Sequence, residues 1–202
     1  MIRIITASVF TVLGFLTILV TVYPFFVWQF YYLPKIENQR ILSPLANYEM
    51  SNSERVSQES DNRNAISEFF ISVPKLGIDE AKVEADSTDF YSSLAHYPQT
   101  ALPGERGNVF ITGHSVLPYF FDPKNYYSIF STLHTLERGD EITISLPNSN
   151  KYRYIVIGMA VVNPEDTWVL KTPDRDGNYV SLFTCTPPGL TTKRLVVLGK
   201  EV

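Results

Sequence analysis

The chain has 202 residues, 45% of them hydrophobic, which is enough for one compact core and an additional segment. Its formal net charge is −4. This balance excludes a broad basic surface of the kind that binds nucleic acid phosphates. The single cysteine, Cys185, excludes an intramolecular disulfide.

The first predicted element is an apolar helix near the N-terminus. No charged residue occurs in 4–34, and 4–23 alone reaches the roughly 20 residues that a helix needs to cross a bilayer. Aromatic residues gather at its far end, as they do at membrane interfaces. The apolar run exceeds the core of a secretory signal, and no small-residue cleavage site is evident. We therefore predict that 1–34 is an uncleaved membrane anchor, and the flanking basic residues leave its orientation open.

A polar segment, 35–66, follows the predicted anchor. Between 47 and 64 it is rich in Ser, Asn, Glu and Gln. Such a sequence buries too little apolar surface to offset the entropy lost on ordering. We expect a flexible stalk that leads to a folded domain at 67–202.

The remaining part of the chain, 67–202, alternates short apolar runs with turn residues, a pattern typical of an all-β sandwich or barrel. Strong turn signals stand at 147–150 and 174–178. Two short peripheral helices are expected, at 87–94 and 126–136. Because closure removes exposed strand edges, we predict a small closed β-barrel. The expected strands are 69–73, 108–113, 141–146, 151–162, 179–184 and 194–198.

Cys185 ends an apolar strand and is followed by Thr-Pro-Pro-Gly. Because proline stops strand pairing, the thiol is expected at the end of a strand, where it can line a cleft. This position suits a nucleophile. A free cysteine is also a common buried hydrophobe, and this alternative stays open on strand context alone.

Two further residues could join a reactive thiol. His114 ends another expected strand, and an imidazole that titrates near neutrality can exchange a proton with a thiol and a leaving amine. Arg194 opens the last expected strand, across a hairpin from Cys185, and its guanidinium suits a developing oxyanion. The other histidines fit less well, because we place His96 in a loop and His134 on the solvated side of a helix.

These residues carry a resemblance to a known family. Leu-Phe-Thr-Cys at 182–185 followed by Arg194 resembles the TLxTC…R signature of sortases, and Ile-Thr-Gly-His at 111–114 resembles their upstream histidine segment. Ser181 stands where the signature has threonine, and it keeps the hydroxyl. The sequence after the cysteine is more similar to the pilin-polymerising and class D or E branches than to class A. A lid motif and a second membrane span, typical of pilin polymerases, are not apparent, so the subclass stays open.

The resemblance implies an eight-stranded sortase-type barrel and a cysteine transpeptidase. Cys185 would be the nucleophile, His114 the proton-transfer group and Arg194 the oxyanion stabiliser. Substrate binding is assigned by the resemblance to Thr112, Trp168 and Thr184.

The expected substrate is a surface protein with an LPxTG-like C-terminal sorting signal, passed through a thioester to an amine of peptidoglycan or a pilin lysine. The expected location is the cell membrane, with the N-terminus cytoplasmic and the catalytic domain outside. Core packing is an equally good account of Trp168, and Thr184 could be an ordinary strand residue.

Neither a metal nor another cofactor is predicted. One cysteine and three scattered histidines lack the ligand spacing of a zinc site, and the turn 174–178 lacks the downstream glutamate of an EF-hand. Three other classes of protein are alternatives: a cysteine peptidase, an L,D-transpeptidase, and a membrane-tethered β-barrel binding module with a structural cysteine. The papain-like sequence and the Ser-His-Gly-Cys run expected of the first two are absent from the sequence.

Overall fold

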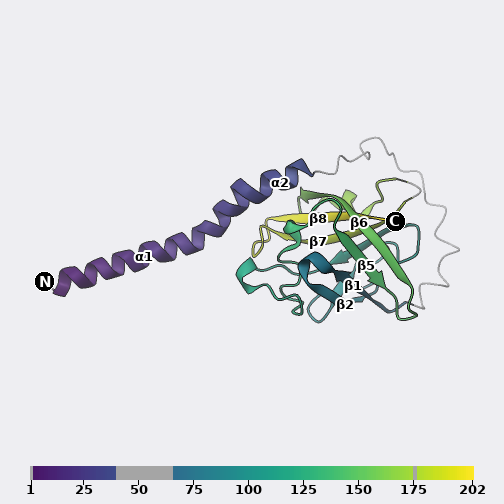
Figure 1. The fold of residues 1–202 in the computed structure, drawn as a ribbon, viewed down its shortest axis with the longest axis horizontal. Coiled ribbons are helices and arrows are strands. Elements are labelled where there is room, and N and C mark those ends of the chain that lie inside the picture. The colour runs from purple at the N-terminus through teal and green to yellow at the C-terminus, as the bar shows by residue number, and fades with distance from the viewer. Residues whose placement is uncertain (1, 40–65, 175–176) are drawn as a thin grey trace. The chain divides into compact units, whose positions relative to one another are not determined.

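The computed structural model describes residues 2–39, 66–174 and 177–202 (Figure 1). The chain divides into two compact units, Met1–Asn38 and Gln39–Val202. Most of the predicted stalk falls in 40–65 and lies outside the described residues, so its flexibility stays a prediction.

The first unit is helical. It consists of α1 (Ile2–Val27), the π-helical turn η1 (Trp28–Tyr32) and α2 (Leu33–Asn38). Its segment Ser8–Asn38 is long and apolar enough to cross a membrane by length and composition, a test that an N-terminal signal sequence also passes. The hydroxyl of Thr21 donates to the carbonyl of Thr17 at 2.8 Å, so the helix satisfies this polar group internally.

The second unit is a closed eight-stranded β-barrel, as the sequence predicted (Figure 1). The strands follow one another around the barrel in the order β1-β2-β3-β4-β7-β8-β6-β5, and β5 pairs with β1 to close it. All neighbouring pairs are antiparallel except β2–β3 and β4–β7. The strands are β1 (Glu68–Val73), β2 (Ile78–Glu84), β3 (Leu94–His96), β4 (Gly107–Thr112), β5 (Glu141–Ser145), β6 (Lys151–Val162), β7 (Asn178–Thr186) and β8 (Lys193–Glu201).

The six expected strands correspond to β1, β4, β5, β6, β7 and β8, whereas β2 and β3 were missed. Four of the seven residues of β2 are charged, and only Ile78, Ala81 and Val83 are buried. Strand β3 has three residues, too few for a period-2 pattern to be recognised. Both strands are therefore specified by their barrel partners more than by their own sequence.

The two helices expected at 87–94 and 126–136 are corrected by the structure. Residues 87–90 have no regular structure and 91–93 form bends that lead into β3, because side chains there bond to nearby backbone groups instead of leaving them to form a helix. The Asp89 N–H donates to the Ser87 hydroxyl at 3.1 Å, and the Tyr91 N–H donates to the Asp89 carboxylate at 3.0 Å.

The second segment is a series of turns that ends in the 3₁₀ helix η5 (Leu133–Thr135). Its backbone bonds span three residues, as in the bond from the Leu136 N–H to the Leu133 carbonyl at 3.2 Å, so a 3₁₀ pattern replaces the α-helix. The apolar stripe behind the prediction, Ile129, Leu133 and Leu136, is fully buried. The burial was predicted correctly and the helix type was wrong.

Candidate active site

Cys185 and Arg194 face each other on neighbouring strands. Cys185 lies on β7 and pairs directly with Arg194 on the antiparallel strand β8. Directly opposed residues in an antiparallel pair project to the same face of the sheet, with their Cβ atoms about 5 Å apart. The register therefore places the side chains of Cys185 and Arg194 on the same face of the sheet, and Cys185 is partly exposed.

His114 reaches the same edge from the other side of β7. Strand β4 runs parallel to β7, with Thr112 opposite Phe183, and the pairing continues through the Gly113 N–H, which donates to the Phe183 carbonyl at 3.1 Å. His114 is the next residue. Strand β7 is thus flanked by the imidazole on one side and the guanidinium on the other.

Two hydroxyls fix the segment that carries His114. The Thr184 hydroxyl donates to the Gly113 carbonyl at 2.8 Å, and the Ser115 hydroxyl donates to the Cys185 carbonyl at 2.8 Å. The residues on both sides of His114 are therefore bonded to the strand that carries the thiol. The resemblance assigns Thr184 to substrate binding, and in the structure its hydroxyl bonds the segment that carries His114.

Gly113 permits this close approach. A Cβ atom at Gly113 would lie 2.5 Å from Leu94 Cδ2 and 2.7 Å from Phe130 Cδ2, well inside van der Waals contact. The Phe130 N–H also donates to the His114 carbonyl at 3.1 Å. The path of the chain into His114 therefore depends on the absence of a side chain at this position.

A cavity of about 350 Å³ opens where these residues meet. His114, Cys185 and Arg194 all line it, together with Thr112 and Thr184. A volume of this size suits a peptide segment or a small molecule. We call it the cysteine cavity, and its apolar lining includes Phe110, Val169, Leu170 and Phe183.

Trp168 is not among the residues that line the cysteine cavity. It lies on the 3₁₀ helix η6 (Thr167–Leu170) and packs against a buried apolar cluster that includes Phe110 and Val169. Its neighbours Thr167 and Val169 do line the cavity. The structure thus favours core packing as the account of Trp168, while the residues on either side of it border the cavity.

The guanidinium of Arg194 is held by the backbone. Both hydrogens of Nη1 are used, in bonds to the carbonyls of Thr191 at 2.9 Å and Lys193 at 3.0 Å. A guanidinium carries five N–H groups, so three remain to bind a ligand. Because the acceptors are neutral carbonyls, they do not cancel the charge of Arg194.

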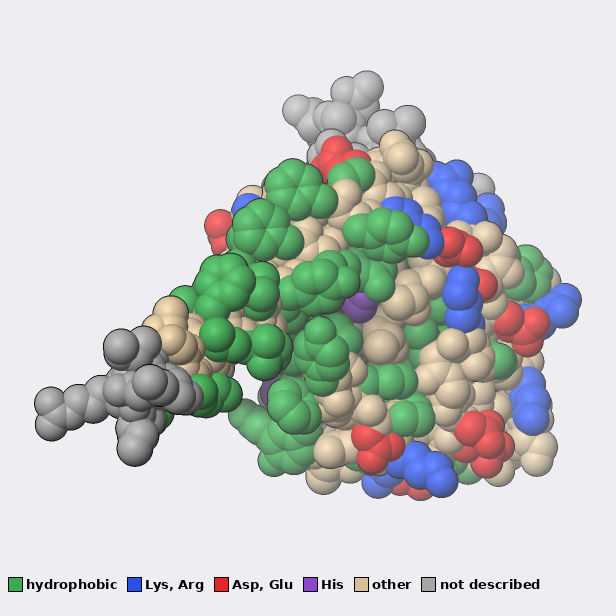
Figure 2. Space-filling view, turned by 60° about the vertical axis from the view of Figure 1, so that its left-hand side comes forward, with side chains coloured by type: hydrophobic (Ala, Val, Ile, Leu, Met, Phe, Trp, Pro, Cys, Tyr) green, Lys and Arg blue, Asp and Glu red, His purple; other side chains and the backbone are tan. Residues whose placement is uncertain are grey.

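Aromatic rings enclose His114. Its ring centroid lies 4.5 Å from that of Phe90, 5.0 Å from Tyr91 and 5.7 Å from Tyr127, the last stacked at an angle of 5°. Figure 2 shows hydrophobic side chains gathered around a histidine on the face that it presents. Burial lowers the pKa of His114 below its ordinary value of 6.5. Its Nε2 atom is buried with no hydrogen-bond partner among the described residues.

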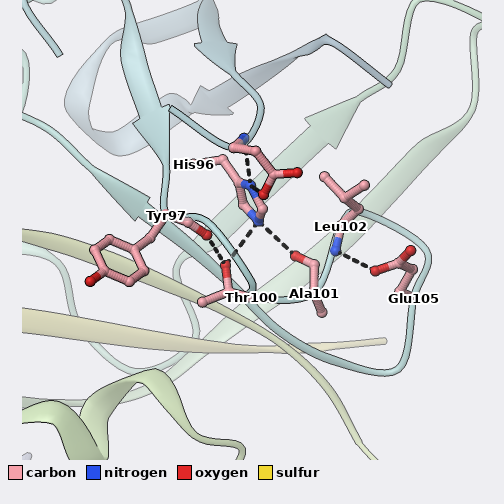
Figure 3. Close-up of polar contacts among 7 residues, drawn as sticks. His96, Tyr97, Thr100, Ala101, Leu102 and Glu105 are labelled. Atoms are coloured by element: carbon pink, nitrogen blue, oxygen red, sulfur yellow. Dashed lines mark hydrogen bonds and ion pairs between the residues drawn. The ribbon is translucent and has the colours of Figure 1, made fainter. Parts of the chain in front are cut away.

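The other two histidines are both buried, and the structure corrects the place predicted for each of them. His134 lies on η5 and is 4% exposed, so it is not a solvated position. His96 belongs to β3 and is fully buried; its Nε2 lies 2.9 Å from the Ala101 carbonyl and 2.9 Å from the Thr100 hydroxyl (Figure 3). Neither lines the cysteine cavity. His96 instead bonds β3 to the loop at Thr100 and Ala101. Its chain neighbours Ala95 and Tyr97 line the cavity.

Sequence reasoning missed Ser115, Phe90, Tyr91 and Tyr127. Ser115 directly follows the predicted histidine in the sequence, and its hydroxyl is a signal that could have indicated a positioning role. The three aromatic residues lie 13 to 24 positions from His114 in sequence, and only the folded barrel brings them to it.

Comparison with known proteins identifies the family. Residues 71–202 match the family model of the sortase domain. The chain belongs to the sortase family. The subclass stays open, because the sortases it resembles include classes A, C and D.

Two curated sortases are similar in sequence. The chain is 25% identical to Sortase D of Bacillus subtilis (strain 168) over 136 residues, which cover 65% of this chain and 62% of the relative. It is 30% identical to Sortase A of Bacillus anthracis over 134 residues, 65% of this chain and 58% of the relative. The match thus spans about three-fifths of the length of each curated sortase.

Solved sortase structures share the fold. Sortase A from Corynebacterium diphtheriae, a lid mutant, has a TM-score of 0.56 at 29% identity, covering 68% of this chain and 70% of that one. A Sortase D5 transpeptidase of Clostridium perfringens has a TM-score of 0.57 at 23% identity, covering 84% of this chain and 94% of that one. At that lower identity the likeness concerns the fold alone.

Proposed function

We propose that this sortase is a cysteine transpeptidase that cleaves an LPxTG-like C-terminal sorting signal and transfers the protein to an amine. The observation that carries the proposal is the meeting of Cys185, His114 and Arg194 around one cavity. A thiol, an imidazole and a guanidinium in one cleft supply a nucleophile, a proton carrier and an oxyanion partner.

In the first half-reaction, Cys185 attacks the carbonyl carbon of the threonine in the sorting signal. His114 is suited to take the thiol proton, because its lowered pKa keeps the imidazole neutral at pH 7. Arg194 offers its three remaining N–H groups to the oxyanion. His114 then gives the proton to the departing glycine amine, and a thioester remains on Cys185.

In the second half-reaction, an amine attacks the thioester carbonyl. A C–N bond forms, the C–S bond breaks, and the sulfur of Cys185 recovers its proton. The acceptor amine belongs to a peptidoglycan peptide or to a pilin lysine, as the resemblance implies. Ser115 and Thr184 serve this step as positioning residues, because they hold the segment of His114 against β7.

The apolar helix Ser8–Asn38 fits a membrane anchor for such an enzyme. We propose that the N-terminus is cytoplasmic and that the barrel lies outside the cell, where sorting signals and acceptors meet. A cysteine accessibility assay on intact cells tests this orientation: an impermeant thiol reagent should label Cys185 without permeabilisation.

The alternatives predict a different state of the thiol or a different product. A binding module with a structural cysteine requires a buried sulfur, whereas Cys185 is partly exposed and lines a cavity. A cysteine peptidase would deliver the acyl group to water and gives Arg194 no evident role. The match to the sortase domain favours transfer to an amine.

The test is to incubate the full chain in detergent with a library of sorting peptides and candidate amines. Mass spectrometry should detect a thioester on Cys185 and an amide with one class of amine, and Cys185→Ala should abolish both. Hydrolysis with every amine offered would refute the transpeptidase.

A further inference from the structure

The three aromatic rings around His114, those of Phe90, Tyr91 and Tyr127, differ in whether they face the cysteine cavity. Phe90 lines the cysteine cavity with His114, whereas Tyr91 and Tyr127 do not line it. These two tyrosines are 57% and 54% exposed although both pack on the imidazole. Their ring centroids are 5.6 Å apart, so they form one continuous surface on the outer side of the histidine. We call this pair the tyrosine site.

Exposed tyrosine rings at such a place call for an explanation. Aromatic side chains that serve the core are buried, whereas these present more than half of their surface to solvent. The face of an aromatic ring carries partial negative charge and attracts a cation within about 6 Å. A site of this kind suits an ammonium group.

Charge around the tyrosine site supports a cationic ligand. The Asp89 carboxylate accepts a hydrogen bond from the Tyr91 N–H at 3.0 Å and is exposed. The turn 122–125 directly precedes the turn 125–128 that carries Tyr127, and it contains exposed Asp122 and one exposed cation, Lys124. Two carboxylates against one ammonium leave these turns with a negative balance.

We propose that the tyrosine site binds the ammonium form of the acceptor amine and delivers it to His114. This inference rests on the proposed function and adds where the second substrate binds. The sorting signal would occupy the cysteine cavity, and the acceptor would approach across the imidazole from the tyrosine side.

The proton balance of this route is complete. A primary amine reaches the site as R–NH₃⁺ and gives one proton to neutral His114. The free amine then attacks the thioester carbonyl on Cys185, forming the C–N bond and breaking the C–S bond. The second amine proton ends on the sulfur, the third stays on the amide nitrogen, and His114 returns its proton to water.

The experiment measures the acceptor concentration that gives half-maximal transfer, with the full chain in detergent, a sorting peptide and a glycine peptide as acceptor. In Tyr91→Leu, which keeps apolar bulk but removes the ring, this concentration should rise about two- to fivefold. Tyr91→Phe keeps the ring and should match the wild type. Tyr127→Leu gives an independent second measurement with the same expected direction.

Two controls separate recognition of charge from general damage. Hydroxylamine is uncharged at neutral pH, so its half-saturating concentration should not rise in Tyr91→Leu. Tyr119→Leu removes a 68% exposed ring outside the tyrosine site and should leave both acceptors unaffected. An equal rise for both nucleophiles, or an unchanged value for the glycine peptide, would overturn the inference.

The same assay distinguishes this inference from the proposed function. If the wild type forms no thioester with any sorting peptide, the proposed function is refuted and the acceptor site with it. If the thioester forms and its dependence on the glycine peptide is the same in Tyr91→Leu, the tyrosine site alone is refuted.

Discussion

Replacing Thr184 by valine should damage catalysis more than its distance from the bond chemistry implies. Valine has nearly the same shape as threonine, so the change removes one hydroxyl from a residue that is 3% exposed. The lost bond is the one to the carbonyl of Gly113, which is itself buried. A buried acceptor left without a donor costs about 1–3 kcal/mol, and the free energy of unfolding should fall by this amount.

Catalysis should suffer through His114. Without Thr184, its segment is tied to β7 by the Ser115 hydroxyl and the Gly113 N–H. A displacement of about 1 Å in a catalytic group can lower a rate about 100-fold. We therefore expect kcat for thioester formation to fall about 10- to 100-fold while KM for the sorting peptide changes little. Thr184→Ser keeps the hydroxyl and should restore most of the rate.

The assays are urea denaturation and single-turnover acylation of the same preparations. Because Thr184 and Ser115 hold the same segment, Thr184→Val and Ser115→Ala should be coupled in a double-mutant cycle by about 0.5–3 kcal/mol. A Thr184→Val protein that is less stable but acylates at the wild-type rate would show that the hydroxyl serves the fold alone.

Four further outcomes are expected. Arg194→Lys should lower transfer about 100- to 1,000-fold, because an ammonium cannot match the guanidinium donors, while alkylation of Cys185 continues unchanged; wild-type transfer would contradict the role. The acid limb of kcat/KM that reports neutral His114 should lie below pH 6.5, and a limb above it would be inconsistent with burial. The same lowered pKa makes stability fall as pH drops below 6.5, since the unfolded chain binds the proton first; urea titrations at several pH values check this. Gly113→Ala should destabilise the barrel by about 1–3 kcal/mol through overlap with Leu94 and Phe130, and an unchanged urea midpoint would contradict this packing account.

The barrel was predictable where strands carry their own pattern. Strand β6 was predicted with the bounds 151–162 that the structure has, because its apolar residues recur along a continuous run. Strand β2 was not, because its charged sequence is held by pairing with β1 and β3. At 126–136 the apolar spacing fixed which residues are buried, but the same spacing fits 3₁₀ turns and an α-helix.

The candidate site was predictable in its chemistry more than in its surroundings. Cys185, His114 and Arg194 stand at strand ends with short-range sequence signals, and the register of β7 and β8 then brings two of them together. The aromatic rings around His114 come from turns that have no periodic pattern. Their contacts with His114 depend on long-range packing, so no local sequence pattern could predict them. Trp168 packs against the buried apolar cluster, which is one of the two interpretations that its sequence context left open.

The backbone hydrogen bonds to Arg194 limit which sequence changes the hairpin between β7 and β8 can accept. The atoms that grip the guanidinium are main-chain oxygens of Thr191 and Lys193, which every amino acid possesses. Exchanges of side chain at these two exposed positions therefore leave the grip in place, whereas inserting or deleting one residue would shift both oxygens. Positions 191 and 193 can thus change their side chains while the hairpin keeps its length, which makes them convenient places to graft new surface chemistry beside the thiol.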